Sequence, residues 1–103
     1  MLRRAALFIL SLGCSSQPVG PAVTCSMQVQ AASGSCDLIA AQPCSDGQFY
    51  EIDCQDDGAC TCVENASPTM SFNASTQPAG YCATFDASLA HDLGTKCGWN
   101  LNP

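Results

Sequence analysis

The residues of this 103-residue chain best suited to chemistry are its nine cysteines, which can form disulfides or bind a metal ion. A cysteine content this high in a short chain is typical of a disulfide scaffold. Standard zinc modules pair cysteines two to four residues apart, and the cysteines here do not follow that spacing. We therefore expect structural disulfides, with no bound metal and no cofactor.

An odd number of cysteines in an exported chain leaves one that is free, bridges to another molecule or is modified. Cys14 stands apart from the others, close to the N-terminus. The remaining eight can close as four disulfides, and they are Cys25, Cys36, Cys44, Cys54, Cys60, Cys62, Cys82 and Cys97. Their spacing alone does not choose among the many possible pairings.

Acidic residues gather around one short stretch, and carboxylates are ligands that calcium prefers. The stretch DCQDDG contains Asp53, Asp56 and Asp57, with Asp46 and Glu51 nearby in the sequence. Their spacing lacks the alternating ligands and the distal glutamate of an EF-hand. Because Asp-Asp-Gly is typical of a turn, we interpret the stretch as a solvated turn rather than a calcium site.

Hydrolytic catalysis would need a base, and the only histidine of the chain is His91. No nucleophile motif stands near it, and the adjacent Asp92 points elsewhere on a helix. We interpret His91 as a residue at a helix C-terminus, where its cationic form interacts favourably with the helix dipole. Trp99 is a candidate contact for a partner or a sugar, but we expect it to pack over a disulfide of Cys97. The sequence predicts no catalytic residue.

The N-terminal residues predict export. Arg3 and Arg4 precede an apolar run over residues 5–12, and small residues follow. As a helix this run is about 12 Å long, too short for the roughly 30 Å of hydrocarbon in a bilayer. We therefore expect a cleaved signal peptide over residues 1–13, a tether over residues 14–23 and a disulfide-rich domain over residues 24–103.

The clearest local pattern is a β-hairpin in GQFYEIDCQDDGACTCVEN, where two β-prone runs flank an Asp-Asp-Gly turn. A three-residue loop with Gly58 in the left-handed conformation pairs Cys54 with Cys60 and Ile52 with Cys62. Alternation then places Tyr50, Ile52, Cys54, Cys60 and Cys62 on the buried face. The face toward solvent carries Glu51, Asp53, Thr61 and Val63.

The hairpin cysteines raise a question of pairing. Cys60 and Cys62 point the same way on one strand and diverge too much to bond each other. A bridge between Cys54 and Cys60 is geometrically possible, but it joins strands that the turn already joins. Because a longer closed loop removes more entropy from the unfolded chain, we expect these cysteines to bond to other elements.

A C-terminal helix is predicted by apolar residues that recur three and four positions apart on one stripe, namely Cys82, Phe85, Leu89 and Leu93. Thr76 as N-cap and Gly94 as C-cap bound this helix over residues 77–93. We expect Cys82 and Cys97 to tie the helix to the sheet.

Weaker patterns predict further strands in VTCSMQVQA, CDLIAAQPC and TMSFNAS. If the chain is a binding module, we expect residues 63–79 to form a loop that is presented to a partner. The expected fold class is α+β: a small disulfide-rich domain with an antiparallel sheet built on the hairpin and one C-terminal helix.

The stretch LSLGC resembles the lipobox of bacterial lipoproteins, in which a leucine, a small residue and an invariant cysteine direct lipidation and cleavage. Gly13 and Cys14 fit this pattern, whereas Ser11 stands where that family usually has leucine. The resemblance implies lipidation of Cys14, and several acyl chains give a stable membrane anchor. The alternative is cleavage slightly later, after Ser16, which discards Cys14 and releases a soluble protein.

The order of features from DGQFYEIDCQDDGACTCVEN through Cys82 to KCGWNL resembles a small module in cysteine-rich lipoproteins of predatory soil bacteria. The resemblance covers about half of the chain. It implies the same hairpin and a helix that ends in Cys97, Gly98 and Trp99. It implies no activity.

The charge of the chain limits its partners. Once the leader is removed, nine acidic residues face Lys96 as the only lysine or arginine. Such a surface repels nucleic-acid phosphates, so we expect no nucleic-acid partner. The leading hypothesis is a non-enzymatic protein of the cell envelope, an outer-membrane lipoprotein attached through Cys14 or a secreted or periplasmic form, with an undefined protein or glycan partner. The alternative is a secreted binding module, such as a small protease inhibitor or an adhesion domain.

Overall fold

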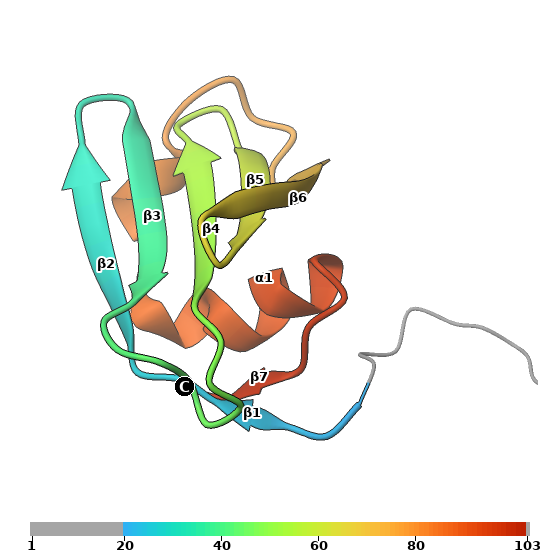
Figure 1. The fold of residues 1–103 in the computed structure, drawn as a ribbon. Coiled ribbons are helices and arrows are strands. Elements are labelled where there is room, and N and C mark those ends of the chain that lie inside the picture. Colours follow the sequence, from blue (N-terminus) through green and yellow to red (C-terminus); the bar gives the residue numbers. More distant parts are fainter. Residues whose placement is uncertain (1–19, 103) are drawn as a thin grey trace, which may run out of the picture.

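The structure is a computed structural model that describes residues 20–102. The predicted signal peptide, most of the tether and Cys14 lie outside the described residues. Five antiparallel strands form one sheet, and helical segments pack on one of its faces (Figure 1). In their order across the sheet the strands are β2 (Met27–Ala32), β3 (Ser35–Ala40), β4 (Tyr50–Gln55), β5 (Ala59–Glu64) and β6 (Ser67–Asn73).

A second sheet joins the two ends of the described chain. In it β1 (Val23–Thr24) pairs in parallel with β7 (Leu101–Asn102). The helical segments between β6 and β7 are the 3-10 turns η3 (Tyr81–Thr84) and η4 (Ala87–Leu89) and the helix α1 (Ala90–Lys96). The fold is therefore α+β, as predicted. Within residues 20–102, no helix combines the length and the apolar character needed to cross a bilayer.

The predicted hairpin is confirmed in register and in orientation. Ile52 lies opposite Cys62 and Cys54 opposite Cys60, and Gly58 has a φ of 90°. The side chains predicted to face inward are buried, because the strands alternate above and below the sheet. Val63 departs from the expected polarity, since it is buried on the outer face at a bulge beside Pro68.

The weaker strand predictions are also confirmed, since VTCSMQVQA forms β1 and most of β2, CDLIAAQPC contains most of β3, and TMSFNAS forms most of β6. The prediction of a presented loop over residues 63–79 is wrong for residues 63–73, which belong to β5, a turn and β6. Asn65 and Ala66 form a two-residue turn at φ values of 52° and 69°, and this turn returns the chain as β6 beside β5.

Four disulfides join the eight cysteines of the described residues, as Cys25–Cys44, Cys36–Cys82, Cys54–Cys60 and Cys62–Cys97. Cys82 and Cys97 tie the helical segment to the sheet, as predicted. The expectation that Cys54 and Cys60 bond to other elements is wrong. Their Cα atoms lie 4.0 Å apart, directly opposite each other on the same buried face, which brings the two sulfur atoms within bonding distance. A larger entropy gain from a longer loop does not overcome this proximity.

The predicted helix over residues 77–93 is largely replaced by turns. Asp56 accepts hydrogen bonds from the backbone N–H groups of Gly80 and Cys82, and Gly80 has a φ of 95°. These bonds hold the backbone in a conformation that interrupts a continuous helix. Gly94 lies inside α1 and is buried, rather than acting as its cap. Gly98, with a φ of 83°, takes the left-handed position after the helix.

The glycine at the hairpin turn gives a first test. A methyl group on Gly58 would lie 2.7 Å from Cβ and 2.8 Å from the backbone nitrogen of Ser75. We expect Gly58→Ala to lower the free energy of unfolding by about 2–4 kcal/mol through strain and overpacking. Gly47 has a similar φ of 81° but no atom within 4 Å of such a methyl group. Gly47→Ala should therefore cost only about 1 kcal/mol in urea unfolding.

The disulfides give a second test, because they close loops of different length. The Cys62–Cys97 bond spans 35 residues and the Cys54–Cys60 bond spans 6. Loop entropy predicts losses of about 3.8 and about 2.2 kcal/mol when each pair is replaced by alanine. Thermal unfolding of the two double variants should show the larger loss for Cys62→Ala with Cys97→Ala. Equal losses would contradict the entropic origin of their stabilisation.

Candidate functional site

The helical segments pack on one face of the five-stranded sheet and leave the other, outer face uncovered (Figure 1). Side chains that alternate outward from β3, β4 and β5 lie on it, including Asp37, Glu51, Asp53 and Thr61. Lys96 lies on α1, on the other side of the sheet. The acidic side chains of this face therefore have no basic residue beside them within the described chain.

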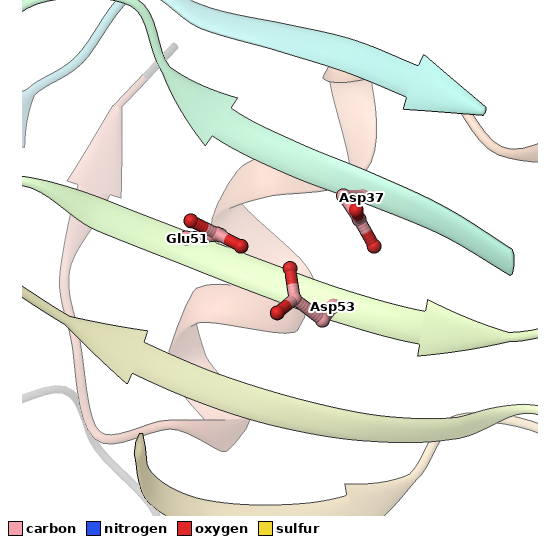
Figure 2. Close-up of side chains that lie close together, drawn as sticks. All are labelled: Asp37, Glu51 and Asp53. Carbon is pink, nitrogen blue, oxygen red and sulfur yellow. The ribbon is translucent and has the colours of Figure 1, made fainter. Parts of the chain in front are cut away.

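Three carboxylates form a cluster at the centre of this face. Figure 2 shows Asp37 on β3 and Glu51 and Asp53 on β4, all projecting from the same side of the sheet. One oxygen from each residue lies within 4.8 Å of the other two. Asp37 and Asp53 are direct cross-strand neighbours, an arrangement in which two like charges destabilise a sheet.

The cluster changes the acidity of its members. Burial, followed by the hydrogen bond and negative charge of Glu51, raises the pKa of Asp53 to about 7. Burial, followed by the charge of Asp53, also raises the pKa of Asp37. Among the described residues, Asp53 Oδ1 is buried and has no hydrogen-bond partner. A proton on one carboxyl group gives such an oxygen a donor and reduces the repulsion, so the cluster binds a proton at mildly acidic pH.

A groove of about 490 Å³ runs beside the cluster toward the turn of the β4–β5 hairpin. Its lining is mixed, with the carboxylates of Asp37 and Asp53 at one side and Pro68, Phe72 and Asn73 of β6 at the other. A second hollow of about 420 Å³ lies on the same face and is lined largely by apolar residues, among them Ile39, Phe49 and Ala66. Both hollows include Val63, so the acidic and the apolar parts of the face are continuous.

This arrangement has the chemical capacity to bind positive charge. Three carboxylate oxygens suit a hard cation such as calcium, with water completing the coordination shell, or the ammonium or guanidinium group of a larger molecule. The residues first considered for calcium are only partly brought together. Asp53 belongs to the cluster with Glu51. Asp46 and Asp57 instead bond to nearby backbone or to Tyr50, and Asp56 bonds to the backbone of a distant segment at Gly80 and Cys82.

The acidic turn thus has a structural role. Asp57 accepts a hydrogen bond from the N–H of Ala59, and Asp56 binds the chain at Gly80 and Cys82. These backbone bonds lower the pKa of Asp56. The hydrogen bond that the Tyr50 hydroxyl donates to Asp46, 2.6 Å long, likewise lowers the pKa of Asp46. The interpretation as a turn fits this geometry, although the turn also organises a distant segment.

The remaining residues singled out from the sequence lie elsewhere. His91 is in the first turn of α1 rather than at its C-terminus, because the helix begins later than predicted. Its Nδ1 donates a hydrogen bond of 2.9 Å to the carbonyl oxygen of Leu101 and so joins α1 to β7. Trp99 is buried against Tyr50, with ring centroids 4.8 Å apart. Neither residue lies on the outer face, and Cys14 is outside the described residues.

Asp37 is the member of the cluster that the sequence analysis did not identify. It stands between inward-facing Cys36 and Leu38, so alternation alone indicates that it faces outward. Its position opposite Asp53 depends on the register between β3 and β4, which are separated by a loop of nine residues, 41–49. No short-range pattern specifies that register.

Comparison of the chain with protein-family models, with curated proteins and with solved structures finds no match. The function proposed below therefore depends on the chain's own residues.

The shared proton predicts how stability depends on pH. The folded pKa of Asp53, about 7, lies above its ordinary value of 3.8. The folded state therefore holds a proton that the unfolded state has released, and stability falls as pH rises from about 4 to about 7. Carboxyl groups with a lowered pKa, such as Asp56 and Asp86, change the stability only at pH values below this window.

We expect Asp53→Asn to remove most of this fall, which should be about 1 kcal/mol once solvent screening of the half-exposed cluster is included. A smaller part remains, because burial also raises the pKa of Asp37. Urea unfolding across the window measures it. Asp92→Asn on α1 is the matched control and should keep the native dependence. A stability that rises with pH in the native protein would contradict the shared proton.

Proposed function

We propose that this chain is a non-enzymatic protein of the cell envelope that a lipid on Cys14 attaches to a membrane. The domain would serve as a rigid module that presents the outer face of its sheet to a partner. This extends the resemblance to small cysteine-rich bacterial lipoproteins, for which residues 11–14 supply the sequence pattern.

The observation that supports the proposal most directly is the pairing of the cysteines. All eight cysteines of the described residues belong to four disulfides within the domain. A fold of this size held by four disulfides is typical of an extracellular or periplasmic protein. Cys14 therefore has no partner among those eight, which favours chemical modification or removal over an internal disulfide.

The position of the chain ends is compatible with this attachment. The N-terminal segment enters the domain at β1, which lies beside β7 at one end of the molecule (Figure 1). The Asp-Asp-Gly turn of the β4–β5 hairpin lies at the opposite end of β4. A tether that leads into β1 therefore leaves the outer face of the sheet and the hairpin turn accessible.

One observation favours the alternative, a released binding module such as an inhibitor or an adhesion domain. The outer face combines an acidic cluster, a groove of about 490 Å³ and a neighbouring apolar hollow, in which Phe49 is 44% exposed. Such a mixture of charged and apolar surface is typical of binding sites rather than of a plain solvated face. Release and anchoring differ only in the fate of Cys14.

Intact-mass spectrometry of the exported protein tests the proposal. We expect a mature chain that begins at an acylated Cys14 and is eight hydrogens lighter than the fully reduced form, because four disulfides have formed. The variant Cys14→Ser should lose the lipid mass and the membrane association. It should keep the same four disulfides as the native protein. An unmodified N-terminus after Ser16 would replace anchoring with the released form, and free thiols in the domain would contradict both.

A further inference from the structure

The two edges of the five-stranded sheet differ in how they are protected. An edge strand exposes unpaired backbone N–H and C=O groups, which another strand can bind. At the β6 edge, Pro68 removes one donor and a bulge between Cys62 and Val63 interrupts the pairing. At the opposite edge, β2 contains no proline, glycine or bulge, and its six residues pair with β3 in continuous register.

The hairpin geometry determines which backbone groups of β2 are available. Ser33 and Gly34 form a two-residue loop, so Ala32 and Ser35 make the hydrogen-bonded pair next to it. Ala41 also donates to the carbonyl oxygen of Ser26, which fixes the same alternation at the other end of the strand. The even-numbered residues of β2 therefore bond to β3. The odd-numbered residues direct their N–H and C=O groups away from the sheet, and they are Met27, Val29 and Ala31.

The side chains of β2 also favour pairing. The strand MQVQAA carries no charge, in a chain with nine acidic residues and a single lysine in the described part. Val29 is 40% exposed, although it lies opposite the fully buried Leu38. An uncharged, unprotected edge strand with an exposed β-branched residue is the type of strand that binds another strand.

We propose that β2 is the interface for a second copy of this chain. The two β2 strands pair antiparallel about a two-fold axis beside Val29, so that the Val29 residues of the two copies face each other. Met27 of each copy then lies opposite Ala31 of the other. The same outward-facing groups act on both sides, because an antiparallel pair of identical strands is self-complementary.

The distribution of charge allows two copies to approach here. The nearest carboxylate on the sheet is Asp37 of β3, one strand away from the edge. In a continuous sheet the two Asp37 residues lie three strand spacings apart, about 14 Å. This exceeds the screening length of about 8 Å at physiological ionic strength. Asp86, on the segment that contacts β2 from the covered face, is directed to the backbone of Ser88 as an N-cap.

The proposed contact is small, and its strength follows from its size. One pair of six-residue strands buries less than the roughly 1,600 Å² typical of stable complexes. We therefore expect a reversible dimer whose population depends on protein concentration. The β2 edge is the same in an anchored and a released chain, so the dimer does not require the lipid anchor.

Sedimentation equilibrium of the exported, oxidised protein, in mild detergent if it is lipidated, tests this interface. The native chain should show a mass that rises with concentration from one copy toward two. Val29→Lys places two like charges opposite each other at the two-fold axis and should weaken association by about tenfold or more. Met70→Lys is the matched control, because Met70 is 45% exposed on the β6 edge. It should leave association unchanged.

Three results would overturn the proposal. These are a native chain that stays monomeric at all concentrations, two variants that weaken association equally, and a loss confined to Met70→Lys. Circular dichroism and thiol titration of each variant establish that the fold and the four disulfides persist. Binding of a foreign extended peptide at β2 by a monomeric chain would replace the second copy with another occupant.

Discussion

The covalent bonds between sulfur atoms are the constraint on which this structure depends. Five of its eight largest fully buried side chains are cysteines, and the other three are Leu38, Ile52 and Leu101. The disulfides therefore crosslink the chain, and their cysteines also make up much of the buried core. A chain this short buries too little apolar surface for packing alone to give a comfortable margin of stability. Such dependence on disulfides in a small fold is typical of extracellular and periplasmic proteins.

The parts of the fold predicted from sequence are those specified by neighbouring residues. The β4–β5 hairpin follows from alternation and from one glycine in the left-handed region, and both signals lie within about 15 residues. The C-terminal helix is shorter than its helical apolar spacing predicts, because hydrogen bonds to another segment constrain its backbone. Asp56, more than 20 residues away, accepts hydrogen bonds from Gly80 and Cys82 and prevents a regular helix there. Local periodicity contains no information about such a bond.

The candidate site illustrates the same limit. The outward orientation of Asp53 and Glu51 could be predicted from the hairpin, but the cluster also requires Asp37 from a strand across a loop. Two carboxylates directly opposite each other are an unfavourable pair that a sheet ordinarily avoids. Here the raised pKa values allow the cluster to hold a proton, and this proton reduces the repulsion between the carboxylates. The raised pKa values arise only in the assembled sheet, not in any single segment. The pairing of Cys54 with Cys60 follows from the short distance that the hairpin itself imposes, although a longer loop would give a larger entropic stabilisation.

The bond between Cys25 and Cys44 has a mechanical consequence for any force that enters through the N-terminal segment. Cys25 directly follows β1, and Cys44 lies shortly before β4. A covalent shortcut therefore connects the point of entry to the centre of the sheet and bypasses residues 26–43. Tension between an N-terminal attachment and a load held by β4 or β5 would pass through this sulfur link. The β2–β3 hairpin lies outside that path and would keep its hydrogen bonds while the rest of the domain is pulled.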